Sequence, residues 1–293
     1  MGDDMFERFR RSWRLAKASW AVLRADRELL VFPLLSFLAL IVVLITFAVP
    51  AVLLGGLSDA ETGTYNVSTI VLGFAFYVVA YSVMFYFNTA LVGAAMIRLD
   101  GGDPTVRDGF RIATSRLPAI IGYAVIAATV GMILRFISER VGFIGQIIIG
   151  VLGFAWSILT FLVVPVLVVE QIGPIAAVKR SGELLRKTWG EQLIGGSGIG
   201  IVFGLLVVVV IAIGMALAFA ISSVSVYLAI VVGVITVLAV GAISLVGAAL
   251  GGIYMASLYR FATKGEAGAF GTEEMTAAFR QKPAKGGLLG GLR

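Results

Sequence analysis

Residues 176–196, AAVKRSGELLRKTWGEQLIGG, place a charge-rich segment in the middle of an apolar chain. Five of its first twelve side chains are ionised, and apolar runs of membrane length lie on both sides. At 100° per residue one stripe collects Val178, Gly182, Leu185 and Trp189. The charged residues on the opposite side are Lys179, Arg180, Glu183, Lys187 and Glu191. This pattern is typical of a helix in a membrane interface, with its apolar stripe toward lipid or toward the rest of a helix bundle.

The composition places the chain among membrane proteins. Of its 293 residues, 59% are hydrophobic and 14% are charged, whereas soluble domains carry about a quarter charged residues. The net charge of +6 is explained by loops that face anionic lipid, so we expect no nucleic-acid partner.

The chain contains no Cys and no His. This excludes thiol nucleophiles, Cys/His zinc sites, His-ligated haem and His-based catalytic triads. The 17 Asp and Glu residues are not clustered along the chain. The sequence therefore indicates no catalytic, metal-binding or cofactor-binding residue, and we expect a protein that is not an enzyme.

Six apolar stretches reach the length of about 20 residues that a membrane-spanning helix needs. They are residues 29–54, 67–97, 117–136, 143–169, 193–220 and 226–258. We expect residues 1–262 to form a single transmembrane domain and residues 263–293 to form a partly disordered cytoplasmic tail.

The basic residues predict the orientation of these spans. Of the 23 Lys and Arg residues, 21 fall before the first span or after the second, fourth and sixth. The other side has only Arg135 and Arg140. Because positive charge is retained in the cytoplasm, we expect a multi-pass protein of the cell membrane with both termini cytoplasmic.

Each pair of spans follows a charged segment, at about residues 6–27, 105–116 and 175–192. Pro104 and Pro174 mark the first helical turn of the last two segments. The sequence therefore predicts an all-α polytopic membrane bundle. Its six helices form three hairpins, each preceded by a cytoplasmic amphipathic helix.

Two blocks of sequence resemble a known family. FERFRRSWRLAKASWAVLRADRELLVFPLLS (residues 6–36) and VPVLVVEQIGPIAAVKRSGELLRKTWGEQLIGG (residues 164–196) resemble an uncharacterised prokaryotic family of six-helix membrane proteins, over the chain to about Ala262. Pro174, Arg180 and Ser181 give a looser likeness to the membrane domains of some bacterial glycerophosphodiester phosphodiesterases. These resemblances imply a fold and a location, and no activity.

Two groups of side chains are candidate sites. Cations and tryptophans at the interface would contact lipid headgroups, which are anionic: Lys179, Arg180, Lys187, Trp189, Arg116, Trp13 and Trp20. Polar groups in or near the spans would make interhelical hydrogen bonds or line a pore: Asn88, Tyr81, Gln146 and Glu170. We expect the Glu170 carboxylate to pair with Arg180 or Arg116.

The sequence does not decide the activity. We expect a non-enzymatic integral membrane protein that acts through lipid or protein contacts at the cytoplasmic face, with membrane lipids as partners. The alternative is a transporter or channel for a small solute, which needs a water-lined cavity near Asn88 and Tyr81. An intramembrane enzyme would need convergent acids or a nucleophile.

Overall fold

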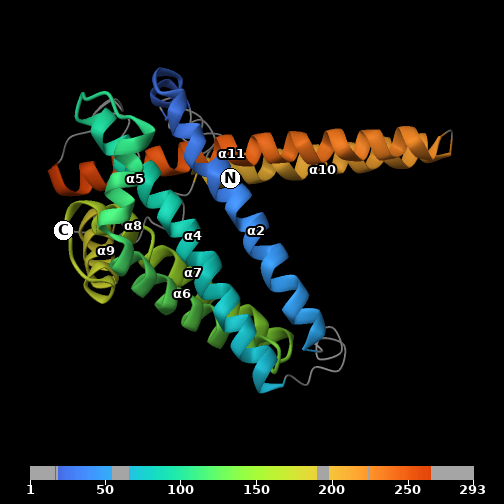
Figure 1. Cartoon of the computed structure of the whole chain (residues 1–293), viewed down its shortest axis with the longest axis horizontal. Coiled ribbons are helices and arrows are strands. Elements are labelled where there is room, and N and C mark those ends of the chain that lie inside the picture. Colours follow the sequence, from blue (N-terminus) through green and yellow to red (C-terminus); the bar gives the residue numbers. More distant parts are fainter. Residues whose placement is uncertain (1–16, 18, 55–65, 190–197, 224, 265–293) are drawn as a thin grey trace, which may run out of the picture.

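The computed structural model describes residues 17, 19–54, 66–189, 198–223 and 225–264. Over these residues the chain is helical and has no strand. A short helix at residues 19–25 comes first, and all later elements except η1 are labelled in Figure 1. The later elements are η1 (Arg27–Leu30), α2 (Val31–Leu53), α4 (Val67–Leu99), α5 (Val106–Ser115), α6 (Leu117–Ser138), α7 (Phe143–Leu159), α8 (Val163–Val169), α9 (Pro174–Trp189), α10 (Gly198–Ser222) and α11 (Val226–Lys264).

The described residues contain six segments that are long and apolar enough to cross a membrane, which confirms the predicted number. They are Arg27–Leu53, Val67–Leu99, Leu117–Ser138, Phe143–Val169, Val202–Ser222 and Val226–Lys264. The sixth runs beyond its predicted end at residue 258. Residues 193–197, expected to begin the fifth span, lie outside the described residues.

The fourth span is interrupted. A turn at residues 160–162 separates α7 from α8. No residue of α7 is buried, whereas five residues of α8 are, from Val163 to Leu167. The backbone N–H of Leu162 donates to the hydroxyl of buried Ser181 in α9 at 3.1 Å. A side chain of α9 thus satisfies a backbone group at the break.

Helix α4 is the centre of the molecule, with α2, α5, α6, α8 and α11 packed around it. Helices α2, α4, α6 and α7 run roughly side by side in Figure 1. In contrast, α10 and α11 form a hairpin that extends away from them, and α10 packs chiefly along α11.

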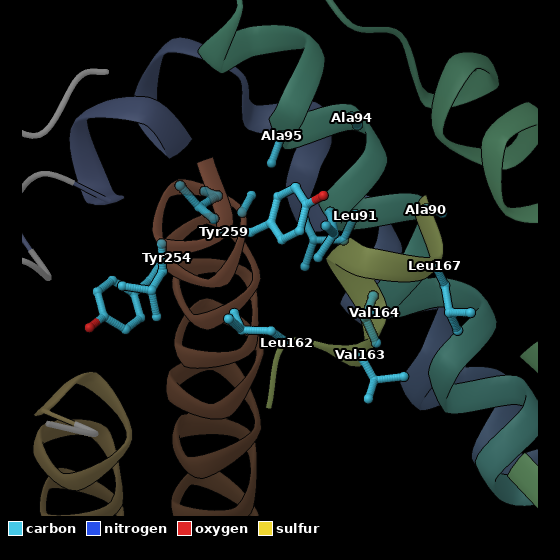
Figure 2. Close-up of a cluster of buried hydrophobic side chains, with 14 of the residues drawn as sticks. Ala90, Leu91, Ala94, Ala95, Leu162, Val163, Val164, Leu167, Tyr254 and Tyr259 are labelled. Atoms are coloured by element: carbon cyan, nitrogen blue, oxygen red, sulfur yellow. The ribbon is translucent and has the colours of Figure 1, made fainter. Parts of the chain in front are cut away.

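The buried core lies at one end of the molecule, which we call the α5–α9 end. It holds α5, α8, α9, the helix at residues 19–25, the last turns of α4 and the C-terminal part of α11. Figure 2 shows where α4, α8 and α11 meet, with Ala90, Leu91, Ala94 and Ala95 turned toward α8 and α11. Alanine at three of these four positions lets the helix backbones approach closely.

The structure confirms one of the two predicted proline positions and corrects the other. Pro174 is the first residue of α9, as predicted. Pro104 is not in the first turn of α5, because the helix begins at Val106 and the hydroxyl of Thr105 caps it. An N-cap side chain accepts a hydrogen bond from a backbone N–H of the first turn, and the residue before it is outside the helix.

Candidate functional site

Ion pairs join distant segments at the α5–α9 end. The guanidinium of Arg98, in the last turn of α4, binds both carboxylate oxygens of Asp26, which is 8% exposed. Arg98 also contacts Asp103 at 3.2 Å. A bidentate arginine–carboxylate pair is among the strongest polar contacts in proteins. It fixes the start of the first span to the end of the second.

The N-terminus of α5 is held by two carboxylates. Glu28 of η1 accepts a hydrogen bond from the backbone N–H of Val106 at 3.2 Å. Thr105 and Asp108 form a reciprocal capping box. Hydrogen bonds from the Thr105 hydroxyl and backbone N–H hold the pKa of the Asp108 carboxyl below its ordinary range.

Glu170 connects three elements. Its carboxylate oxygens lie 2.9 Å and 3.0 Å from Nε of Arg180 in α9. The hydroxyl of Tyr259 in α11 donates to the same carboxylate at 3.0 Å. The hydrogen bond to Glu170 raises the pKa of the Arg180 guanidinium above its ordinary value. Arg180 is therefore the partner of Glu170, rather than the alternative Arg116.

The end of α11 closes against the end of α4. Arg260 binds the backbone carbonyl of Leu99 and, at 2.9 Å, the carboxylate of Asp100. Lys264, the last described residue, lies 3.9 Å from the same carboxylate. The C-terminal end of the described chain thus lies at the α5–α9 end. Asp26, near the N-terminal end of the described chain, lies there too.

The predicted interface residues fall into different environments. Lys179 and Trp20 are exposed, Trp20 by 47%. Arg180 is held by Glu170. Arg116 is half-buried, and its buried Nε has no hydrogen-bond partner among the described residues. Trp13 and the side chains of Lys187 and Trp189 lie outside what the structure describes.

Further exposed cations surround this end. We call the basic rim the set formed by Lys17, Arg24, Arg27, Arg107, Lys179 and Arg186. Of these, the sequence singled out only Lys179 as a site residue. The others were used only to predict orientation, because charge counts along a chain do not separate a free cation from a paired one.

The predicted polar residues do not form one cluster. The side-chain oxygen of Asn88 lies beside Gly252 of α11, 3.8 Å from where a Cβ would stand. Gln146 is exposed on α7. Tyr81 lies on another seam, where α4 packs on α6: its hydroxyl is 3.6 Å from the Cβ position of Gly131.

Three further hydroxyls belong to the seam of Tyr81. We call the hydroxyl seam the set formed by Tyr77, Tyr81, Tyr123 and Thr160. Of these four, the sequence singled out only Tyr81 as a candidate, because no sequence pattern showed that α6 and the break in the fourth span approach α4. Within the described residues, no group of three or more acidic side chains could hold a metal ion.

Six described helical segments that are long and apolar enough to cross a membrane are typical of the class of multi-pass α-helical membrane proteins. More particularly, the chain belongs to a family of unknown function (DUF6159), whose model matches residues 66–270. The quoted block at residues 164–196 lies inside this range, and the block at residues 6–36 lies before it. No curated protein and no solved structure matches the chain. The likeness to glycerophosphodiester phosphodiesterase membrane domains stays a prediction.

Proposed function

We propose that the protein is a non-enzymatic integral membrane protein that acts by binding anionic lipid headgroups at its α5–α9 end. The observation that carries this proposal is the basic rim, six exposed cations at one end of an apolar molecule. A Lys or Arg near an anionic membrane surface contributes about 1 kcal/mol of attraction. The exposed ring of Trp20 suits the same depth.

The acids at this end support the proposal, because several of them are engaged inside the protein. Asp26 is bound by Arg98, Glu170 by Arg180, and Asp100 by Arg260. These carboxylates therefore oppose the rim less than their number suggests. With the positive-inside rule, the rim supports a cytoplasmic α5–α9 end and a location in the cell membrane.

Helix α9 supports an interfacial position. It buries Ala177, Ser181, Leu184 and Leu185 against the bundle. Lys179 and Arg186 are exposed. We assign to α5, α9 and the helix at residues 19–25 the role of cytoplasmic amphipathic helices, each before one pair of spans. In α9 these buried side chains serve the bundle and the cations serve the headgroups; of the predicted stripe, Leu185 is buried, whereas Val178 and Gly182 are half-buried.

Native mass spectrometry of the purified full chain tests this proposal. Phosphatidylglycerol is titrated onto the wild type and onto a chain carrying Arg24→Gln, Lys179→Gln and Arg186→Gln. We expect each lost cation to weaken binding about fivefold. The matched control keeps the charges with Arg24→Lys, Lys179→Arg and Arg186→Lys, and should bind as the wild type does. Equal binding by all three chains contradicts the proposal.

The interrupted fourth span favours a second candidate, a transporter or channel for a small solute. Transporters place substrate sites at discontinuous membrane helices, and α7 and α8 form such a pair. Solute flux into vesicles that contain the protein, lost on Thr160→Val, would support this alternative. If Thr160→Val leaves the flux unchanged, the break in the fourth span is not the substrate site.

A further inference from the structure

A row of aromatic rings follows one side of α4 where it packs on α6. The ring centroids of Tyr77 and Tyr81 are 6.0 Å apart, and those of Tyr81 and Phe85 are 5.8 Å apart. Phe85 in turn lies 4.5 Å from Tyr123 of α6. The row thus passes from α4 to α6 and carries three phenol hydroxyls with it.

Both ends of the row continue into other polar groups. At one end, Nη1 of Arg135 donates to the hydroxyl of Tyr77 at 3.1 Å, and Nε donates to Glu139 at 2.8 Å. At the other end, the phenol of Tyr123 lies near the side chain of Thr160, at the break in the fourth span.

The seam is deep on the scale of a membrane. Tyr123 and Arg135 belong to the same helix, α6, and twelve residues of helix cover about 18 Å. This is more than half of a hydrocarbon layer of about 30 Å. Polar groups at this depth are uncommon, because hydrocarbon offers them no hydrogen bonds.

Tyr81 is the central member of the seam. Its ring is half-buried, and its hydroxyl lies 3.6 Å from the Cβ position of Gly131, a residue with no side chain of its own. Within the described residues, no hydrogen bond to this hydroxyl is found. An unpaired hydroxyl in hydrocarbon costs free energy, so a polar group that reaches Tyr81 from outside the protein would be stabilised there.

The surroundings of the seam favour a lipid over a free solute. The two helices also have exposed apolar side chains on their other faces, Val79 on α4 and Val125, Ile133 and Ile137 on α6, which suit surrounding acyl chains. Arg135 is 58% exposed. Its two hydrogen bonds, to Tyr77 and Glu139, engage two of five N–H donors. The other donors suit a phosphate.

We propose that the hydroxyl seam binds the headgroup of a membrane phospholipid, with its phosphate at Arg135, and lets that headgroup move past Tyr81 into the hydrocarbon layer. This gives the protein a second activity, passive movement of phospholipid between leaflets. The seam is separate from the basic rim, so either proposal can fail without the other.

The test is a lipid-movement assay on the full chain in vesicles of phosphatidylcholine and phosphatidylglycerol with a fluorescent phospholipid. Dithionite bleaches the label in the outer leaflet, and later loss of fluorescence reports movement from the inner leaflet. We expect the wild type to move lipid faster than protein-free vesicles. Tyr81→Phe keeps the ring, removes the hydroxyl and should slow movement about threefold, the effect of one hydrogen bond in a membrane.

A second variant crowds the Tyr81 hydroxyl instead of removing it. Gly131→Leu should also slow lipid movement, because its side chain would lie against the Tyr81 hydroxyl. The controls are Gly150→Leu, at a position on α7 with no atom within 4 Å of a Cβ, and Tyr227→Phe, at a position 83% exposed. Both should move lipid at the wild-type rate. Thermal unfolding in detergent checks that all chains fold.

Three outcomes would overturn the proposal. The first is a wild-type rate equal to that of protein-free vesicles, and the second is a rate that Tyr81→Phe and Gly131→Leu leave unchanged. The third is osmotic swelling by glycerol that depends on Tyr81 while lipid movement does not. This third outcome would assign the seam to a small solute.

Discussion

The carboxylate of Asp26 and the guanidinium of Arg98 form a bidentate ion pair across 72 residues of sequence. Asp26 precedes η1, and Arg98 lies in the last turn of α4. Because Asp26 is 8% exposed, its charge depends on Arg98 for compensation. The pair therefore holds the N-terminal segment against the centre of the molecule.

Replacing Asp26 by Asn should destabilise the protein by about 2 kcal/mol, because Arg98 then loses its main charged partner. Thermal unfolding in detergent, followed by circular dichroism, measures the change. The matched control is Asp103→Asn. Asp103 also contacts Arg98, but it is 91% exposed, and exposed pairs contribute about 0–1 kcal/mol. Equal effects of the two variants would contradict the role given to Asp26.

A second prediction separates two neighbouring cations. Arg180 binds Glu170, whereas Lys179 is exposed. Arg180→Gln should lower the free energy of unfolding by about 1–2 kcal/mol, because it removes a charged hydrogen bond between α8 and α9. Lys179→Gln should change it by less than about 0.5 kcal/mol. The same unfolding experiment compares them, and a larger effect at Lys179 would reverse this assignment.

The sequence predicted the parts of the fold that depend on local patterns. The six spans follow from apolar length, and the segment of α9 follows from helical periodicity around Val178 and Leu185. The pairing of Glu170 with Arg180 could be proposed because the two residues are ten positions apart. Such contacts need no knowledge of which helices are neighbours.

The other contacts depend on that knowledge. Asp26 and Arg98 have no shared sequence pattern, and neither have Tyr81 and Tyr123, which meet through Phe85 because α4 packs on α6. The break at Thr160 could not be predicted either, because residues 143–169 read as one apolar run and Pro165 lies beyond the turn. The partner of the break is Ser181, a residue of another helix.

A third prediction concerns the close approach of α11 to α4. A Cβ at Gly252 would lie 2.9 Å from Cγ of Leu91, which is buried. Gly252→Ala should therefore destabilise the protein by about 1–3 kcal/mol through overpacking. The neighbouring Gly251 has no atom within 4 Å of its Cβ position, so Gly251→Ala is the control. Thermal unfolding should show a loss at Gly252 only, and a similar loss at both would argue against this packing.

The last prediction concerns pH and the first turn of α5. Hydrogen bonds from Thr105 lower the pKa of Asp108 in the folded protein, relative to about 3.9 for an unfolded aspartate. The capping box therefore stabilises the helix fully above the unfolded pKa. It loses this contribution as the pH falls through the lowered folded pKa. Acidification should open the turn, and hydrogen exchange at residues 106–109, corrected for intrinsic rates, measures this opening.

The Asp108→Asn chain is the control for this pH effect. It should exchange faster than the wild type at neutral pH and depend less on pH, because the titrating carboxylate is gone. Glu28 must be separated from Asp108, because its carboxylate binds the backbone N–H of Val106 in the same turn. A full pH dependence that survives in Asp108→Asn would assign the effect to Glu28. Loss of the dependence in this chain, and its retention in Glu28→Gln, would assign it to the capping box.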